Sequence, residues 1–321
     1  MLIIIVSLAY YFAHPIATPK QLKVERGSIK KIIADLQLQY GLPLSILDVY
    51  ALRLIGTPQS GWIDLGATSM SRADFLHKLT TAKAALVSVK LTPGETTYLF
   101  LQSVSKSYKL SFEAIEQIYK KFAPYPEGVL FPDTYYVPKG IDARHLIEYL
   151  VKTSLKRHEA LSKKLFGNYN QKLWFTRTVT IASIVQKEAA SKEEMPLVAS
   201  VIYNRLKRGM PLQMDGTLNY GKYSHHKVTA KRIREDRSAF NTYLHKGLPP
   251  YPVCMVSLDA IKAAVAPAKS DYLYFVKGAD GKHIFSKSYS SHVRNIKDVK
   301  KRNKKRKSFR SVGSLSKDKR K

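Results

Sequence analysis

The stretch TIASIVQKEAASKEEMPLVASVIYNRLKRGMPLQMDGTLNYG, residues 180–221, decides how the rest of the sequence is interpreted. On a helix, Ile181, Ile184, Val185 and position 188 fall at i, i+3, i+4 and i+7, so they share one face. Position 188 is a glutamate, where the period calls for an apolar residue. A mostly buried carboxylate has its charged form disfavoured, so Glu188 would hold a proton near neutral pH, as a general acid must.

The same periodicity allows a purely structural interpretation of Glu188. It lies where the helical pattern ends, beside Ala189 and Ala190, and could simply pair with a nearby cation. The candidate cations are Arg177, Lys187 and Arg205. Both interpretations stay open on the pattern alone.

Further stretches on both sides of this core complete a recognisable pattern. Residues 180–221 closely resemble the core of the endolytic murein transglycosylases, the MltG or YceG-like family. Three further segments agree with the family in order and spacing: EGVLFPDTYYVPKG (127–140), FNTYLHKGLPPYPVC (240–254) and YLYFVKGADGKHIFSKSYSSH (272–292). Within the core, the matching positions are Ala182-Ser183-Ile184, Asn204-Arg205-Leu206, Met210 to Gln213, Asp215, Thr217 and Tyr220-Gly221.

This resemblance implies an activity and a catalytic residue. The chain would be an endolytic lytic transglycosylase that cleaves the MurNAc-GlcNAc bond of nascent peptidoglycan and ends glycan elongation. Glu188 would protonate the leaving oxygen and then deprotonate the C6 hydroxyl of the same sugar, which closes a 1,6-anhydro ring without water. Partnership with penicillin-binding proteins of the elongation machinery is implied in the same way.

Seven further side chains are candidate glycan contacts, because amides, carboxylates and aromatic rings bind sugars by hydrogen bonds and stacking. They are Asn204, Gln213, Asp215, Thr217, Tyr220, Asn241 and Tyr243. Asp215 could also act as a second carboxylate, which would make the enzyme a muramidase that hydrolyses its substrate. Ordinary packing is the alternative for each of the seven.

Three positions depart from the family pattern. Gln186 stands where a second glutamate is common, so only Glu188 can carry the acid role in this segment. Gly216 replaces a frequent proline, and Met255-Val256-Ser257 replaces Asn-Pro-Gly. The changes at Gly216 and at 255–257 concern turn rigidity more than chemistry.

The fold expected is α+β, with a small LysM-like βα module at residues 21–90 and a mixed α+β catalytic domain at residues 91–298. The module begins with a strand and the amphipathic helix IKKIIADLQLQYG, which ends at Gly41. Two tight turns are expected, at Asp215-Gly216 and at Asp280-Gly281.

The N-terminal run MLIIIVSLAYYFAHPIA, residues 1–17, has no Lys or Arg and is expected to be a membrane anchor whose start is incomplete. The cations that follow it would place the body in the cytoplasm by the positive-inside bias. The family topology instead implies a single-pass protein of the bacterial inner membrane with its catalytic domain in the periplasm.

The formal net charge of +30 favours polyanionic partners. Residues 299–321 hold 12 Lys or Arg against one acid and are expected to form a disordered basic tail. No zinc, helix-turn-helix or RNA-binding signature accompanies the charge, so nucleic acid is not the expected partner.

Cofactor chemistry has little support in the sequence. Cys254 is the only cysteine, which excludes a Cys-rich metal site and an internal disulfide. His225 and His226 have no ligands at regular spacing, so neither a metal nor a cofactor is expected. Besides the hydrolase, a noncatalytic peptidoglycan-binding protein is the competing function, and replacement of Glu188 by Gln distinguishes it.

Overall fold

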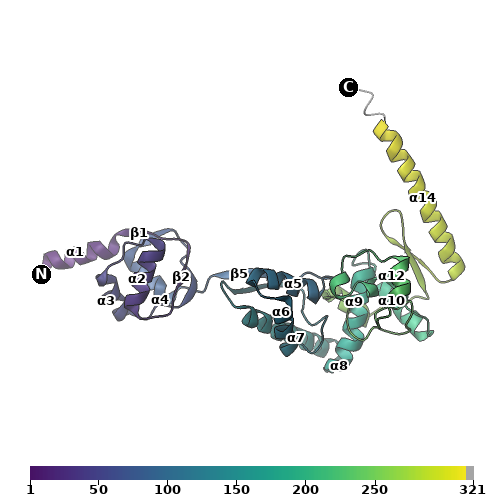
Figure 1. Cartoon of the computed structure of the whole chain (residues 1–321), viewed down its shortest axis with the longest axis horizontal. Helices are drawn as coiled ribbons and strands as arrows, with labels where there is room; N and C mark the ends of the chain where they lie inside the picture. Colours follow the sequence, from purple (N-terminus) through teal and green to yellow (C-terminus); the bar gives the residue numbers. More distant parts are fainter. Residues whose placement is uncertain (316–321) are drawn as a thin grey trace. The chain divides into compact units, whose positions relative to one another are not determined.

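The chain is an α+β protein, and its computed structural model describes residues 1–315, with side chains to residue 303 (Figure 1). It divides into two compact units, each described here by itself. The first unit comprises residues 1–89 and 134–142, and the second comprises the remainder. The segment 134–142 therefore lies in the N-terminal unit, although the sequence placed it within the catalytic domain.

The first unit consists of short helices and two-stranded pairs. Strand β2 runs antiparallel to β3, with Leu22 opposite Ile63, and both side chains are buried in the core of this unit. The elements are α1 (Leu2–Ala13), β1 (Pro15–Ala17), β2 (Gln21–Val24), α2 (Ile29–Tyr40), α3 (Ile46–Ile55), β3 (Gly61–Asp64), β4 (Ser69–Ser71), α4 (Arg72–Thr81), β5 (Leu86–Lys90) and β6 (Thr134–Pro138).

Helix α2 confirms the amphipathic helix expected from the sequence. The Ser28 side chain accepts a hydrogen bond from the Lys31 amide, so it caps the first turn. Gly41 ends the helix at φ 63°, a left-handed conformation that glycine adopts without steric cost. The apolar face of the helix, which includes Ile32 and Leu36, packs into the core.

Helix α1 corrects the expectation of a single-pass inner-membrane protein. It has only 12 residues, Leu2–Ala13, and the chain turns into strand β1 at Pro15. At about 1.5 Å per residue such a helix covers roughly 18 Å, against a hydrocarbon core of about 30 Å. Across residues 1–315, no helix combines the length and the apolar character that crossing a bilayer needs.

The second unit is mostly helical and surrounds a central helix, α9 (Thr180–Glu188). Helices α13 and α10 pack against α9, and all residues of α9 from Thr180 to Val185 are buried. The other elements are α5 (Thr97–Tyr108), α6 (Phe112–Phe122), α7 (Ala143–Phe166), α8 (Gln171–Leu173), the π-helix η1 (Trp174–Val179), α10 (Met195–Lys207), α11 (Asp215–Leu218), the 3-10 helix η2 (Gly221–Tyr223), α12 (Ala230–Glu235), α13 (Leu258–Val265), β7 (Tyr274–Lys277), β8 (His283–Ser286) and α14 (Tyr289–Leu315).

One of the two expected hairpins is present. Strands β7 and β8 pair antiparallel around Gly281, which has φ 90°. The hairpin expected at Asp215-Gly216 is wrong, because these residues begin the short helix α11. Gly216 does not adopt a positive φ there.

The C-terminal segment also differs from its expectation. Helix α14 runs without interruption from Tyr289 to Leu315, so residues 299–315 are helical where a disordered tail was expected. Lys and Arg favour helices almost as well as Leu does, and a helix needs no apolar face to form when its residues are strong helix formers. The end of the expected tail, 316–321, lies outside the described residues.

Candidate active site

Glu188 is placed by the end of a buried helix. Helices α8, η1 and α9 follow one another without a break, and α9 ends at Glu188, where Ala189 is extended with ψ 134°. The buried side chains Ile184 and Val185 fix the last turn within the core. The Glu188 carboxylate thus lies at the end of the apolar face of α9, where the helix borders a pocket.

This pocket has a volume of about 320 Å³, within the range of small-ligand sites. Its walls come from the ends of α9 and α10, the segment before α11, the loop after α12, strand β7 and the first turn of α14. The lining residues are Glu188, Arg205, Leu212, Gln213, Met214, Asp215, Tyr243, Tyr274, Phe275, Tyr289 and His292.

A single hydrogen bond positions the Glu188 carboxyl. The amide of Gly216 donates to Glu188 Oε1 at 2.6 Å. A Cβ atom at position 216 would lie 2.6 Å from Lys187 Cβ and 2.8 Å from Glu188 Oε1, so only glycine allows this approach. Among the residues that the structure describes, Glu188 Oε2 has no hydrogen-bond partner, and Glu188 lines the pocket.

The surroundings of Glu188 favour its protonated form. Burial raises the pKa of Glu188 to about 7, and the negative charge of Asp215 acts in the same direction. The Gly216 amide and the Arg205 cation lower the pKa of Glu188 but do not offset the loss of solvation. Near neutral pH, Glu188 is therefore protonated in part of the protein molecules, as a general acid requires.

The alternative ion pairs of Glu188 are not formed among the described residues. Lys187 Nζ donates to Ser224 Oγ at 2.8 Å. Arg205 is buried and donates to backbone carbonyls instead, at 2.7 Å to Leu273 and 2.6 Å to Leu212. Arg177, the third candidate, lines a different pocket. Arg205 thus acts on Glu188 through its charge without a direct contact.

Three of the seven expected glycan contacts line the Glu188 pocket. They are Gln213, Asp215 and Tyr243. The hydroxyl of Tyr243 donates to Asp215 Oδ1 at 2.8 Å, which raises the pKa of Tyr243 together with burial of its ring. Gln213 has φ 49°, an unusual conformation for a residue other than glycine, and its backbone N–H donates to the Thr242 carbonyl.

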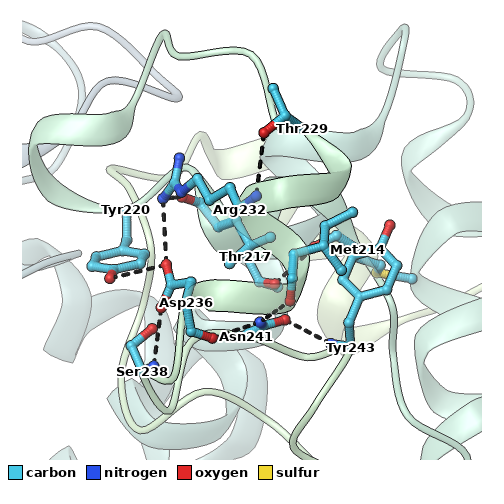
Figure 2. Close-up of polar contacts among 11 residues, drawn as sticks. Met214, Thr217, Tyr220, Thr229, Arg232, Asp236, Ser238, Asn241 and Tyr243 are labelled. Carbon is cyan, nitrogen blue, oxygen red and sulfur yellow. Dashed lines mark hydrogen bonds and ion pairs between the residues drawn. The ribbon is translucent and has the colours of Figure 1, made fainter.

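The other four lie outside this pocket, and all four interact with other parts of the protein; Figure 2 shows Thr217, Tyr220 and Asn241. Asn241 is fully buried and donates to the carbonyls of Ile233 and Asp236. Thr217 is also buried and donates to the Met214 carbonyl at 2.7 Å. These bonds shape the loops beside the pocket and leave the two side chains no room to meet a ligand.

Asn204 and Tyr220 are likewise engaged by the protein. The Asn204 amide donates to the carbonyls of Ser270 and Tyr272. The Tyr220 ring stacks on Phe240 with centroids 4.5 Å apart, and its hydroxyl lies 3.4 Å from Asp236 Oδ2. Both side chains support the fold around the site.

One wall of the pocket was not predicted from the sequence. Tyr274 and Phe275 come from strand β7, and Tyr289 and His292 come from the first turn of α14. The last segment that resembles the family, residues 272–292, contains several Tyr, Phe and His side chains, and this cluster of aromatic residues could have indicated the wall. These residues share a pocket with Glu188 although roughly a hundred residues of chain separate them from it, and no local pattern reveals such a neighbour.

Glu127, a second glutamate with a raised pKa, was not predicted either. Glu127 is 5% exposed, and burial raises its pKa to about 7. Its carboxylate accepts hydrogen bonds from the Thr97 amide at 2.8 Å, from Thr97 Oγ1 at 2.6 Å and from the Gly128 amide at 3.0 Å. Glu127 lines a different pocket of about 160 Å³.

The residues considered as metal ligands have other roles. His225 Nε2 lies 3.0 Å from Glu95 Oε2, in an exposed pair. Cys254 is fully buried, and burial raises the pKa of its thiol. Over the described part of the chain, no group of three or more His, Cys, Asp or Glu side chains is arranged to hold a metal ion.

Comparison with known proteins adds an independent line of evidence. A model of the YceG-like family matches residues 22–298. The endolytic murein transglycosylase of Bacillus subtilis is 33% identical over 177 residues, which cover 54% of this chain and 48% of that protein. The endolytic murein transglycosylase of Streptococcus pneumoniae serotype 2 is 36% identical over 180 residues, which cover 53% and 31%.

A solved structure agrees with these sequence matches. The crystal structure of a yceG-like protein from Listeria monocytogenes matches with a TM-score of 0.56 and 25% identity, over 88% of this chain and 99% of that one. The matches to the two curated relatives span less than half of each relative's length.

Proposed function

Since this chain belongs to the YceG-like family, we propose that it is an endolytic lytic transglycosylase with Glu188 as its single acid and base. The substrate is the MurNAc-GlcNAc bond of nascent peptidoglycan strands, and the cut ends glycan elongation. The observation that carries the proposal is a carboxyl with a pKa of about 7, whose Oε2 has no partner among the described residues, at the wall of a pocket.

The proposed reaction uses this carboxyl twice. Protonated Glu188 donates its proton to the glycosidic oxygen as the bond to the anomeric carbon breaks. The resulting carboxylate then takes the proton of the C6 hydroxyl of the same sugar, and that oxygen bonds to the anomeric carbon. A 1,6-anhydro ring closes, Glu188 is protonated again and no water is consumed.

Gln213, Asp215 and Tyr243 are the proposed glycan contacts, because they line the pocket beside Glu188. Asn204, Thr217, Tyr220 and Asn241 are proposed to hold the surrounding loops in place, as their interactions within the protein support. Tyr289 adds exposed aromatic surface to the same pocket, where a sugar ring can stack.

A hydrolase is the second candidate, because Asp215 lines the same pocket as Glu188. As a base, Asp215 would activate a water molecule and the products would have reducing ends. The hydrogen bond that Asp215 accepts from Tyr243 favours a positioning role instead, since it occupies one of the carboxylate oxygens.

The N-terminal unit is proposed to be a LysM-like module that helps to hold glycan. The order β2, α2, α3, β3, with the two strands paired antiparallel, supports this proposal. Association with penicillin-binding proteins remains a prediction of the family resemblance.

Digestion of purified peptidoglycan followed by mass spectrometry tests the proposed reaction. Wild type is expected to release fragments that end in 1,6-anhydro sugars, and Glu188→Gln is expected to release them at least about a hundred-fold more slowly. Asp215→Asn should still give 1,6-anhydro ends. Reducing ends from wild type, lost in Asp215→Asn, would establish the hydrolase, and binding without any cleavage would establish a noncatalytic protein.

A further inference from the structure

We propose that His292 binds the glycan in the Glu188 pocket, as a neutral imidazole that donates a hydrogen bond from Nε2 to a hydroxyl or acetamido oxygen. This inference rests on the proposed function and adds a substrate-binding residue from α14, which also lines the pocket. It is carried by the position of the ring, by an unpartnered nitrogen and by the charges around it.

The ring of His292 is held in place by stacking. His292 lies in the first turn of α14, and its ring stacks on Tyr274 of strand β7 with centroids 5.2 Å apart and an interplanar angle of 22°. The Arg205 guanidinium lies over the same Tyr274 ring at 5.1 Å from its centroid. His292, Tyr274 and Arg205 all line the pocket that contains Glu188.

The two ring nitrogens of His292 have different surroundings. Nδ1 is buried and has no hydrogen-bond partner among the described residues, whereas Nε2 is not among the buried unpartnered atoms. A proton on Nδ1 would be a buried donor without an acceptor, which costs free energy. The favoured neutral tautomer therefore carries its proton on Nε2, which makes Nε2 a donor that still lacks an acceptor.

The charges around His292 keep it neutral. Burial and the nearby Arg205 cation both lower the pKa of His292. Among the titratable groups that line the pocket, Arg205 is a cation, Glu188 and Asp215 are acids, and Tyr243 has a raised pKa. A neutral donor can hold a sugar oxygen without adding a positive charge that would lower the pKa of Glu188.

A binding experiment with an inactive enzyme tests this role. The probe is an uncrosslinked peptidoglycan tetrasaccharide, titrated by calorimetry into full-length Glu188→Gln and into Glu188→Gln carrying His292→Phe. Phenylalanine keeps the stacking on Tyr274 and removes the donor, so Kd is expected to rise about five-fold, the worth of one hydrogen bond. His145→Phe, the same change at an exposed position of α7, is the matched control and should leave Kd unchanged.

Kinetics and spectroscopy separate a binding role from a packing role. In otherwise wild-type enzyme, His292→Phe should raise KM with a smaller change in kcat. In nitrogen-15 spectra of the unaltered histidine, the neutral Nε2-protonated tautomer is expected, and its Nε2 signal should shift when the tetrasaccharide is added to Glu188→Gln.

Three outcomes overturn the inference. Unchanged Kd and KM in His292→Phe would show that the ring only packs, even if the melting temperature falls. An Nδ1-protonated tautomer, or an Nε2 signal that does not shift when the tetrasaccharide is added, would also overturn the inference, and this test needs no substitution at 292. If wild type neither binds nor cleaves glycan, the proposed function itself fails. If wild type cleaves glycan and His292→Phe has the same Kd and KM as its parent, only this inference fails.

Discussion

Glu188 and Glu127 are two glutamates with the same pKa, about 7, raised in both mainly by loss of solvation. Their hydrogen bonds differ. Three donors from Thr97 and Gly128 hold Glu127 through both oxygens. Glu188 accepts one bond, from Gly216, and its Oε2 has no partner among the described residues.

The difference shows that a raised pKa does not by itself identify a catalytic acid. Desolvation is the main reason that both carboxyls hold a proton near neutral pH. Only an oxygen that is free of protein donors and lies on a pocket can pass that proton to a substrate. We therefore propose Glu188 as the acid and Glu127 as a structural residue, and this comparison can be tested at each residue.

Replacement of Glu188 should have the largest effect. Glu188→Gln removes the transferable proton while keeping size and the bond from Gly216, so kcat is expected to fall about 10²- to 10⁴-fold. Its melting temperature should stay near that of wild type. Release of soluble fragments from peptidoglycan measures the rate, and Glu193→Gln, the same change at an exposed site, should cleave normally.

Replacement of Glu127 should act on stability instead. Glu127→Ala leaves the amides of Thr97 and Gly128 buried without acceptors, so the free energy of unfolding is expected to fall by about 4 kcal/mol. Urea unfolding measures it. Glu116→Ala, which removes only a half-exposed pair with Lys120, should cost under about 1 kcal/mol. An intact fold without activity in Glu127→Ala would reverse the roles of the two glutamates.

The pH dependence of stability should reveal the raised pKa of Glu127. Between pH 4.5 and about 7 the folded protein holds a proton on Glu127 that the unfolded chain has lost. The stability that protonated Glu127 contributes is therefore fully present below pH 4.5 and is lost as the pH rises to about 7. The difference in unfolding free energy between wild type and Glu127→Gln should change by about 3 kcal/mol across that window. A constant difference would show that burial does not raise the pKa of Glu127.

The smallest effect is expected from Asp215. Its negative charge raises the pKa of Glu188, so Asp215→Asn should lower that pKa. Activity needs protonated Glu188 and falls as pH rises through its pKa, and this fall should occur at lower pH in the variant. Profiles of kcat/KM against pH measure the displacement, and a profile that moves to higher pH would contradict the assigned electrostatics.

Local patterns in the sequence predicted the parts that depend on neighbours along the chain. The apolar period through Ile181, Ile184 and Val185 placed Glu188 correctly on the buried face of a helix. Ser28 and Gly41 marked the ends of α2 because capping is decided within one turn. The apolar N-terminal run was misjudged, since its composition does not show that the helix stops after 12 residues.

Contacts distant in sequence account for what the patterns missed. Asn204 and Asn241 resemble sugar ligands in the sequence, but carbonyls of the protein itself already accept their amide hydrogens. His292 reaches the pocket only because α14 packs on strand β7. Gly216 was expected to supply a positive φ angle, whereas its role is to let the backbone approach Glu188.

The central claim is that Glu188 keeps its proton near neutral pH. A carbon-13 titration of the glutamate carboxyls in wild type, with signals assigned from Glu188→Gln and Glu127→Gln, measures this directly. The predicted midpoint for Glu188 is about 7. A midpoint near 4.5, the ordinary value, would contradict the account, because the carboxyl would then have no proton to give at neutral pH.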